Sequence, residues 1–181
     1  MSGTAFPSTV TQVDLGTDAS PQRFPLGYEV TLPATKGGAG GVTNNAGPQT
    51  WVYVFNDDPS NAFAAGTIVY RDPSAATNDW GGATITPATT HQPQVMCLGV
   101  AQHAIAVGSY GFVLKRGVGT ILAGSAGLTV DTPFTSGGSA VGTALDYADD
   151  ASTLGSNIGV IGHTATAISA AATGTAYISC G

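Results

Sequence analysis

The chain has 181 residues, of which only 9% are charged, and its formal net charge is −6. Nucleic-acid binding depends on clustered Lys and Arg, and the five basic residues here include a single adjacent pair, so we expect no nucleic-acid partner. No apolar run approaches the ~20 residues of a membrane-spanning helix, so we expect no membrane partner. An ordinary soluble domain is roughly 25% charged. The scarcity of charge here favours a surface that largely faces other protein, and the alternative is a surface solubilised by Thr, Ser, Asn and Gln.

Residues 1–50 are rich in proline and glycine, which predicts an extended arm with loops and at most one strand, at 24–32. Such a segment buries little against itself, so we expect a neighbouring subunit to order it. Its first 16 residues have neither a basic start nor a long apolar core, which argues against a secretion signal. We therefore expect synthesis in a cytoplasm.

Residues 51–181 contain many short β-branched and aromatic runs separated by Gly, Ser and Thr clusters. This density of strand signals, with almost no helical periodicity, predicts an all-β sandwich or barrel of short antiparallel strands. The clearest strand is 50–56, and the others follow in chain order at 67–71, 94–103, 110–116, 119–123, 128–130, 143–147, 157–164 and 175–179. One short helix remains open within the alanine-rich stretch 163–173.

The chain also contains an internal repeat. LGVAQHA at 98–104 matches IGVIGHT at 158–164, and GFVLKRG at 111–117 matches GTAYISCG at 174–181. GTIVYRD at 66–72 resembles GTALDYAD at 142–149. We therefore predict two related β units, at about 66–117 and 142–181, in which His103 and His163 occupy equivalent strand-end positions.

The residues that could carry chemistry are sparse. There is no Gly-x-Ser-x-Gly elbow, no phosphate-binding glycine loop, and no zinc-ligand spacing among the three histidines. Asp57-Asp58 and the cluster Asp146, Asp149 and Asp150 are interpreted as solvated turns, with a weak calcium site left open for the cluster. We expect no catalytic residue, cofactor or metal.

The two cysteines, Cys97 and Cys180, each lie in an apolar run. We interpret them as buried reduced thiols, and a disulfide is the less expected alternative in a reducing compartment. The candidate partner-contact residues are Trp80, Lys115 and Arg116. Trp80 lies in a long polar excursion at 72–93 that the second repeat lacks, and it is either a contact anchor or a loop plug. Lys115 and Arg116 are candidates for a salt bridge to an acidic partner surface.

Several segments together resemble a known class of protein. They are PLGYEV (25–30), WVYVFND (51–57), GTIVYRD (66–72), LGVAQHAIAVGSYGFVLKRGVGTILAG (98–124) and the closing IGVIGH with GTAYISC. With these segments the chain resembles the head decoration, or cement, proteins of tailed bacteriophages. The resemblance implies a non-enzymatic virion protein, commonly a homotrimer. Such a protein would sit on the outer capsid surface and bridge major capsid protein subunits.

Two other functions compete with this one. A glycan- or receptor-binding module of a phage fibre or tail would use Trp80, Trp51 and surface tyrosines to stack on sugar. A small β enzyme of unknown type is the third alternative. Binding to expanded capsids, compared with retention on glycans, discriminates the first two functions.

Overall fold

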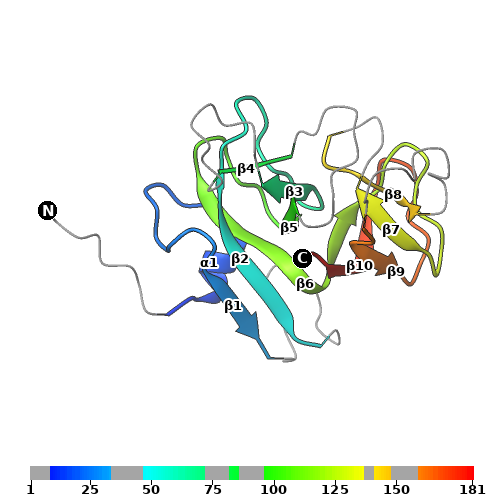
Figure 1. Ribbon diagram of the computed structural model, residues 1–181, viewed down its shortest axis with the longest axis horizontal. Coiled ribbons are helices and arrows are strands. Elements are labelled where there is room, and N and C mark those ends of the chain that lie inside the picture. The colour runs from blue at the N-terminus through cyan, green and yellow to red at the C-terminus, as the bar shows by residue number, and fades with distance from the viewer. Residues whose placement is uncertain (1–8, 34–46, 72–81, 86–95, 137–140, 148–158) are drawn as a thin grey trace, which may run out of the picture.

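A computed structural model describes residues 9–33, 47–71, 82–85, 96–136, 141–147 and 159–181 (Figure 1). The all-β prediction is confirmed, since the regular elements of these described residues are ten strands and one five-residue helix, α1 (Gln12–Gly16). The strands are β1 (Glu29–Leu32), β2 (Gln49–Asn56), β3 (Ile68–Arg71), β4 (Gly82–Thr84), β5 (Cys97–Ala101), β6 (Tyr110–Leu122), β7 (Pro133–Ser136), β8 (Ala144–Asp146), β9 (Gly162–Thr164) and β10 (Thr173–Ser179). None of the helices among the described residues is long and apolar enough to cross a membrane.

Five strands close into a barrel, which we call the first barrel. Their order is β2-β4-β3-β5-β6, and β6 pairs back onto β2. All of these pairings are antiparallel except that of β2 with β4, which is parallel and departs from the expected purely antiparallel arrangement. Because side chains alternate along a strand, one face of each strand fills the interior. The interior residues include Val52, Val54, Val69, Ala101 and Val113.

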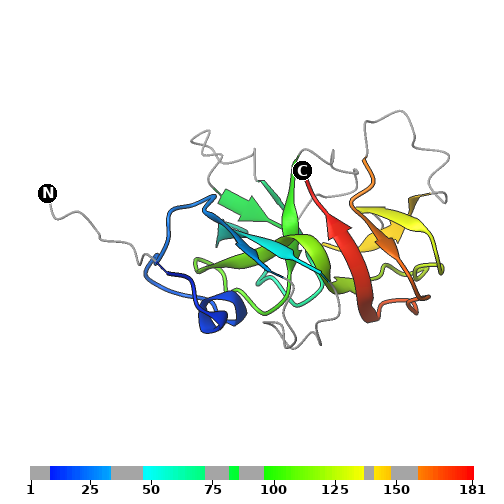
Figure 2. The ribbon, with the colours of Figure 1, turned by 90° about the horizontal axis from the view of Figure 1, so that it is seen from below.

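β6 is 13 residues long and continues beyond the first barrel into a second β unit, which has the order β6-β10-β9-β7-β8. A single parallel bridge between Ala123 and Ala144 joins the two ends of this unit. In Figure 1 the two bodies lie side by side with β6 passing between them, and Figure 2 shows the same arrangement from below. At the crossing, the Gln102 side chain hydrogen-bonds to both the backbone N–H and the carbonyl of Thr120, which ties β6 to the end of β5.

The second unit repeats the hydrogen-bond pattern of the first barrel. Phe63 and Ile105 exchange two backbone hydrogen bonds of 2.9 and 3.0 Å, and Leu128 and Ile168 do the same at 2.8 and 2.9 Å. All four side chains are buried in the interiors of their units. The parallel contact of β2 with β4 recurs as the Ala123–Ala144 bridge. The predicted internal repeat is therefore present as two copies of one five-strand plan that share β6.

The register of the repeat differs from the one predicted. Val69 pairs with Gly99 in the first barrel, and Phe134 pairs with Gly162 in the second unit, so Gly99 and Gly162 are equivalent. Counting from these glycines, His163 matches Val100 and not His103. The sequence match placed the histidines together because both follow an aliphatic residue and a glycine. The strand pairing shifts the alignment of the two units by three residues from the one that the sequence match gave.

The same pairing corrects a second match. β3 corresponds to β7, because each is antiparallel to the strand that carries the equivalent glycine. The segment 66–72, which contains β3, therefore corresponds to the segment around β7 and not to 142–149. The latter segment contains β8, the counterpart of β4.

Residues 9–33 pack against their own barrel, which corrects the expectation of an arm ordered by a neighbour. Leu15 and Phe24 are each 1% exposed. The Phe24 ring lies 5.3 Å from the rings of both Tyr53 and Phe112 on the outer face of the barrel. β1, the one strand expected in this region, pairs antiparallel with β2. These contacts hold the segment because aromatic side chains bury a large apolar area.

Candidate functional site

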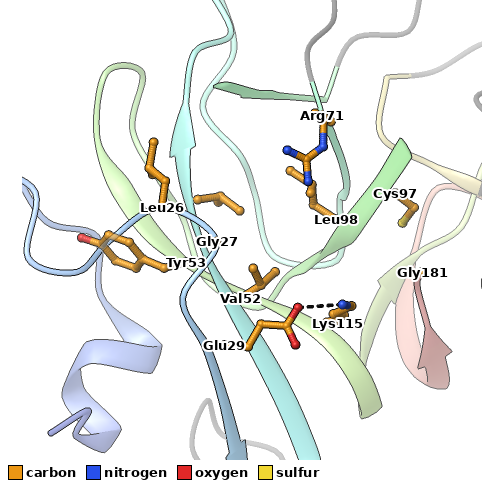
Figure 3. Close-up of a pocket in the computed structure, with 11 residues that line it drawn as sticks. Leu26, Gly27, Glu29, Val52, Tyr53, Arg71, Cys97, Leu98, Lys115 and Gly181 are labelled. Carbon is orange, nitrogen blue, oxygen red and sulfur yellow. Dashed lines mark hydrogen bonds and ion pairs between the residues drawn. The ribbon is translucent and has the colours of Figure 1, made fainter. Parts of the chain in front are cut away.

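A groove of about 510 Å³ lies at one end of the first barrel. Its apolar walls include Val52, Val54 and Leu98, and charged side chains of Glu29, Arg71 and Lys115 stand around them (Figure 3). Barrel mouths are common places for ligand and partner sites, and this volume lies within the usual range of roughly 300–1,000 Å³. The groove is therefore a candidate site for a ligand or a partner.

Strand alternation explains why charges gather at this mouth. Val69 of β3 points into the first barrel, and Arg71 lies two residues further on the same face, where the strand ends. Val113 of β6 is also interior, and Lys115 again lies two residues further along. In Figure 3 the Arg71 and Lys115 side chains reach the groove from opposite walls. On both strands, the inward-facing side chain at this end of the barrel is therefore a cation and not an apolar residue.

A β-bulge brings a third cation to the neighbouring surface. Thr50 pairs with Arg116 and Trp51 with Leu114, so Lys115 is the extra residue in β6. A bulge re-aims side chains, and Arg116 lines an adjoining hollow of about 270 Å³ that also contains Lys115 and Glu29. Two neighbouring hollows are therefore joined through Lys115.

The groove concentrates the positive charge of an acidic protein. Three of the chain's five basic residues, Arg71, Lys115 and Arg116, line the two hollows, whereas the net charge is −6. Lys115 Nζ lies 2.7 Å from Oε1 of Glu29, and the two side chains are 28% and 46% exposed. An ion pair this exposed contributes at most about 1 kcal/mol. A carboxylate of a partner can therefore replace Glu29 at low cost.

The structure brings two of the three predicted contact residues together. Lys115 and Arg116 share one hollow, whereas Trp80 lies outside the described residues. Trp51 is 1% exposed, so the expected stacking of this ring on sugar is wrong. The sequence did not indicate Arg71 or Glu29, although Glu29 is the chain's only glutamate and stands in a predicted strand.

The histidines are not equivalent in their surroundings. His103 is partly buried in the first barrel, and burial lowers its pKa, against the opposing influence of the Asp18 carboxylate. His163 is exposed in β9 of the second unit, and His91 lies outside the described residues. Within the described ranges, no group of three or more His, Cys, Asp or Glu side chains could hold a metal ion.

Two of the carboxylates that the sequence placed in solvated turns are buried and hydrogen-bonded. Asp58 is fully buried, which corrects the expectation of a solvated turn. Its Oδ1 accepts hydrogen bonds from the N–H groups of Ser60 and Asn61, and its Oδ2 accepts one from the hydroxyl of Thr84 in β4. Asp146 is also buried, with both oxygens 3.0 Å from the Thr129 N–H that donates to them. Asp149 and Asp150 lie outside the described residues.

The two cysteines lie opposite each other. Cys97 and Cys180 are buried free thiols, in agreement with the prediction. Their sulfur atoms are 2.7 Å apart. Burial raises the pKa of the Cys97 thiol well above its usual value, and the neighbouring Cys180 raises it further. The contact lies beside the groove, because Cys97 is one of its lining residues.

No protein-family model matches this chain, and no curated protein matches it either.

Proposed function

We propose that this protein is a non-enzymatic virion protein of a tailed bacteriophage. In this proposal it is made in the host cytoplasm and decorates the outer surface of the capsid. There it stabilises the shell by bridging major capsid protein subunits, as a homotrimer. Its effect on the shell follows from mass action, because a protein that binds only the assembled shell shifts the equilibrium toward that state.

The observation that carries the proposal is the pairing of two similar β bodies on one shared strand. Each body presents apolar side chains to solvent in a chain with few charges. In the first barrel and its N-terminal segment Val13 is 67% exposed, and in the second unit Val130 and Tyr177 are 49% and 46% exposed. Depletion of charge is a property of interface cores. Exposed apolar side chains on both bodies suit a protein that bridges two neighbours.

The groove supplies a specific contact for this function. Lys115 is held at the mouth of the first barrel by an exposed ion pair, and Arg116 stands next to it. An acidic side chain of the shell would exchange with Glu29 for Lys115 and would meet the other cations nearby. Such rim contacts contribute more to specificity and association rate than to affinity.

The decisive experiment mixes the purified protein with empty expanded capsids and measures binding by co-sedimentation and shell melting by calorimetry. We expect saturable, stoichiometric binding and a higher melting temperature of the shell. Absence of binding at micromolar protein, together with retention on a glycan array, would overturn the proposal in favour of a glycan-binding module.

Two single-charge variants test the groove itself. Lys115→Gln should weaken capsid binding several-fold, because it removes the cation that meets the partner's carboxylate. Glu29→Gln should strengthen binding, because it removes the competing carboxylate. A purely structural role of the ion pair predicts instead that both variants weaken binding.

Asp131→Asn is the matched control for Glu29→Gln. It removes the same negative charge from an exposed residue of the second unit, and Asp131 does not line the groove. Asparagine tolerates the positive φ of 54° at this position. Equal strengthening by Asp131→Asn and Glu29→Gln would show that net charge alone controls binding.

A further inference from the structure

The two cysteines come from distant parts of the chain and meet where the two units join. Cys97 is the first residue of β5 in the first barrel, and Cys180 directly follows β10 of the second unit, 83 residues later. Their Sγ atoms are 2.7 Å apart, and the side chains are 4% and 1% exposed. A disulfide requires about 2.05 Å between sulfurs, so little movement separates the contact from a bond.

Backbone hydrogen bonds hold both cysteines in place. Cys97 is paired with Tyr70 in the β3–β5 ladder. The N–H of Cys180 donates to the carbonyl of Lys115 in β6 at 2.9 Å. Both cysteines also belong to the cluster of buried residues that connects the two units. The two thiols therefore face each other because backbone hydrogen bonds hold both cysteines in position.

We propose that Cys97 and Cys180 form an intramolecular disulfide under oxidising conditions, and that this bond fastens the end of the second unit to the first barrel. The proposal concerns a covalent modification site and is independent of the virion function. The oxidant is a low-molecular-weight disulfide such as oxidised glutathione.

The reaction takes place by two exchanges. The Cys97 thiol loses its proton to solvent, and its sulfur attacks oxidised glutathione, which releases one glutathione thiolate and leaves a mixed disulfide. The Cys180 thiol then loses its proton, and its sulfur attacks the Cys97 sulfur and expels the second glutathione thiolate. The two released thiolates take up two protons. In sum, two protein thiols are oxidised and one glutathione disulfide is reduced to two glutathione molecules.

We expect the oxidant to approach the pair from the groove, because both side chains are otherwise buried. Cys97 lines the groove together with Gly181, and a Cβ atom added at Gly181 would lie 3.7 Å from the Cys97 carbonyl oxygen. Because the thiolate is the reacting form and burial raises the pKa of Cys97, oxidation should be slow at neutral pH. We expect its rate to increase with pH.

The bond would close a loop that contains β5, all of β6 and the rest of the second unit. Cross-linking stabilises a protein mainly by restricting the unfolded chain, and the effect grows with loop length. For a protein of this size and a loop of this length, we expect the melting temperature to rise by on the order of 10 °C. Reduction with dithiothreitol should return it to the starting value.

The experiment incubates the folded, reduced protein with oxidised glutathione over a range of pH. Free thiols are counted after unfolding, and peptides are mapped by mass spectrometry. We expect both free thiols to disappear and a cross-linked peptide pair that contains Cys97 and Cys180 to form. On a denaturing, non-reducing gel the protein should still run as a single chain, without disulfide-linked dimers. Persistent free thiols, a stable glutathione adduct or disulfide-linked dimers would each overturn the proposal.

Single variants provide the controls. Cys97→Ala and Cys180→Ala should abolish the rise in melting temperature on oxidation, because neither can form the intramolecular bond. A rise that persists in either variant would contradict the proposal. Peptide mapping of the oxidised protein without substitutions shows whether the Cys97–Cys180 bond forms, even where a variant folds poorly.

Discussion

The first barrel and the second unit follow the same strand plan but differ at one end. In the first barrel, Arg71 at the end of β3 and Lys115 within β6 lie at a groove. Counting from the equivalent Gly99 and Gly162, Lys115 corresponds to Ile178. Ile178 is fully buried in a cluster that includes Tyr70, Val100 and Leu114 of the first barrel. The same end of the repeated plan is thus an open, charged site in the first barrel and a buried joint between the units in the second.

The comparison separates residues that build the fold from residues that are free to serve a function. Interior positions such as Val69 and Phe134 are apolar in both units and are fully buried. Charges occur where a strand leaves the interior.

The largest effect is expected in the interior of the second unit. Phe134→Ala should destabilise the protein by about 3–5 kcal/mol, because it leaves a cavity in a fully buried position. Chemical denaturation measures the loss, and the exposed Val130→Ala serves as the control. Because both units share β6, we expect a single cooperative transition. Two separate transitions would show that the units fold independently.

The equivalent pair Lys115 and Ile178 should differ sharply in stability. Ile178→Ala should cost about 2–5 kcal/mol, whereas Lys115→Gln should cost less than about 1 kcal/mol, because its ion pair with Glu29 is exposed. Thermal unfolding of both variants measures the difference. Similar losses of stability in the two variants would contradict the assignment of Ile178 to the joint between the units and of Lys115 to the groove.

The equivalent glycines Gly99 and Gly162 should both resist substitution. A Cβ at Gly99 would lie 2.7 Å from the carbonyl oxygen of Leu114, and a Cβ at Gly162 would overlap both the Phe134 ring and the Tyr177 carbonyl. We expect Gly162→Ala to cost about 1–3 kcal/mol or more, and Gly99→Ala to cost less. Gly16, where an added Cβ would meet no atom within 4 Å, is the control. A greater loss at Gly99 would reverse this ranking.

The smallest effect concerns His103 in the first barrel. Burial lowers the pKa of His103 in the folded state below its unfolded value of about 6.5. As the pH falls through this value, the unfolded chain binds protons first, so stability decreases toward the lower, folded pKa. His103→Gln should make the pH dependence of unfolding shallower in this window. An unchanged slope in His103→Gln would show that burial of this histidine does not contribute to the pH dependence.

The sequence predicted the fold class because strand signals are local. β-branched and aromatic runs such as 50–56 favour strands, and the glycines between the runs mark where the strands end. The repeat was detectable for the same reason, but its register was not. Matching letters aligned His103 with His163, whereas hydrogen bonding between β3 and β5 and between β7 and β9 aligned Gly99 with Gly162.

The candidate site was only partly predictable. Lys115 and Arg116 were identified as the single basic pair in a charge-poor chain. Arg71 was not, because 44 residues of sequence separate it from Lys115 and only barrel closure brings both to one mouth. The single glutamate, Glu29, joins them because β1 adds to the edge of β2.

By itself, the sequence determined that the chain would form short strands, that these would be used twice, and that charge would be scarce. These properties depend on the backbone preferences and hydrophobicity of neighbouring residues. The tertiary structure decided which repeated positions correspond, that the N-terminal segment covers its own barrel, and that Cys97 meets Cys180. Those outcomes depend on pairing between strands far apart in the chain, and no local pattern encodes such pairing.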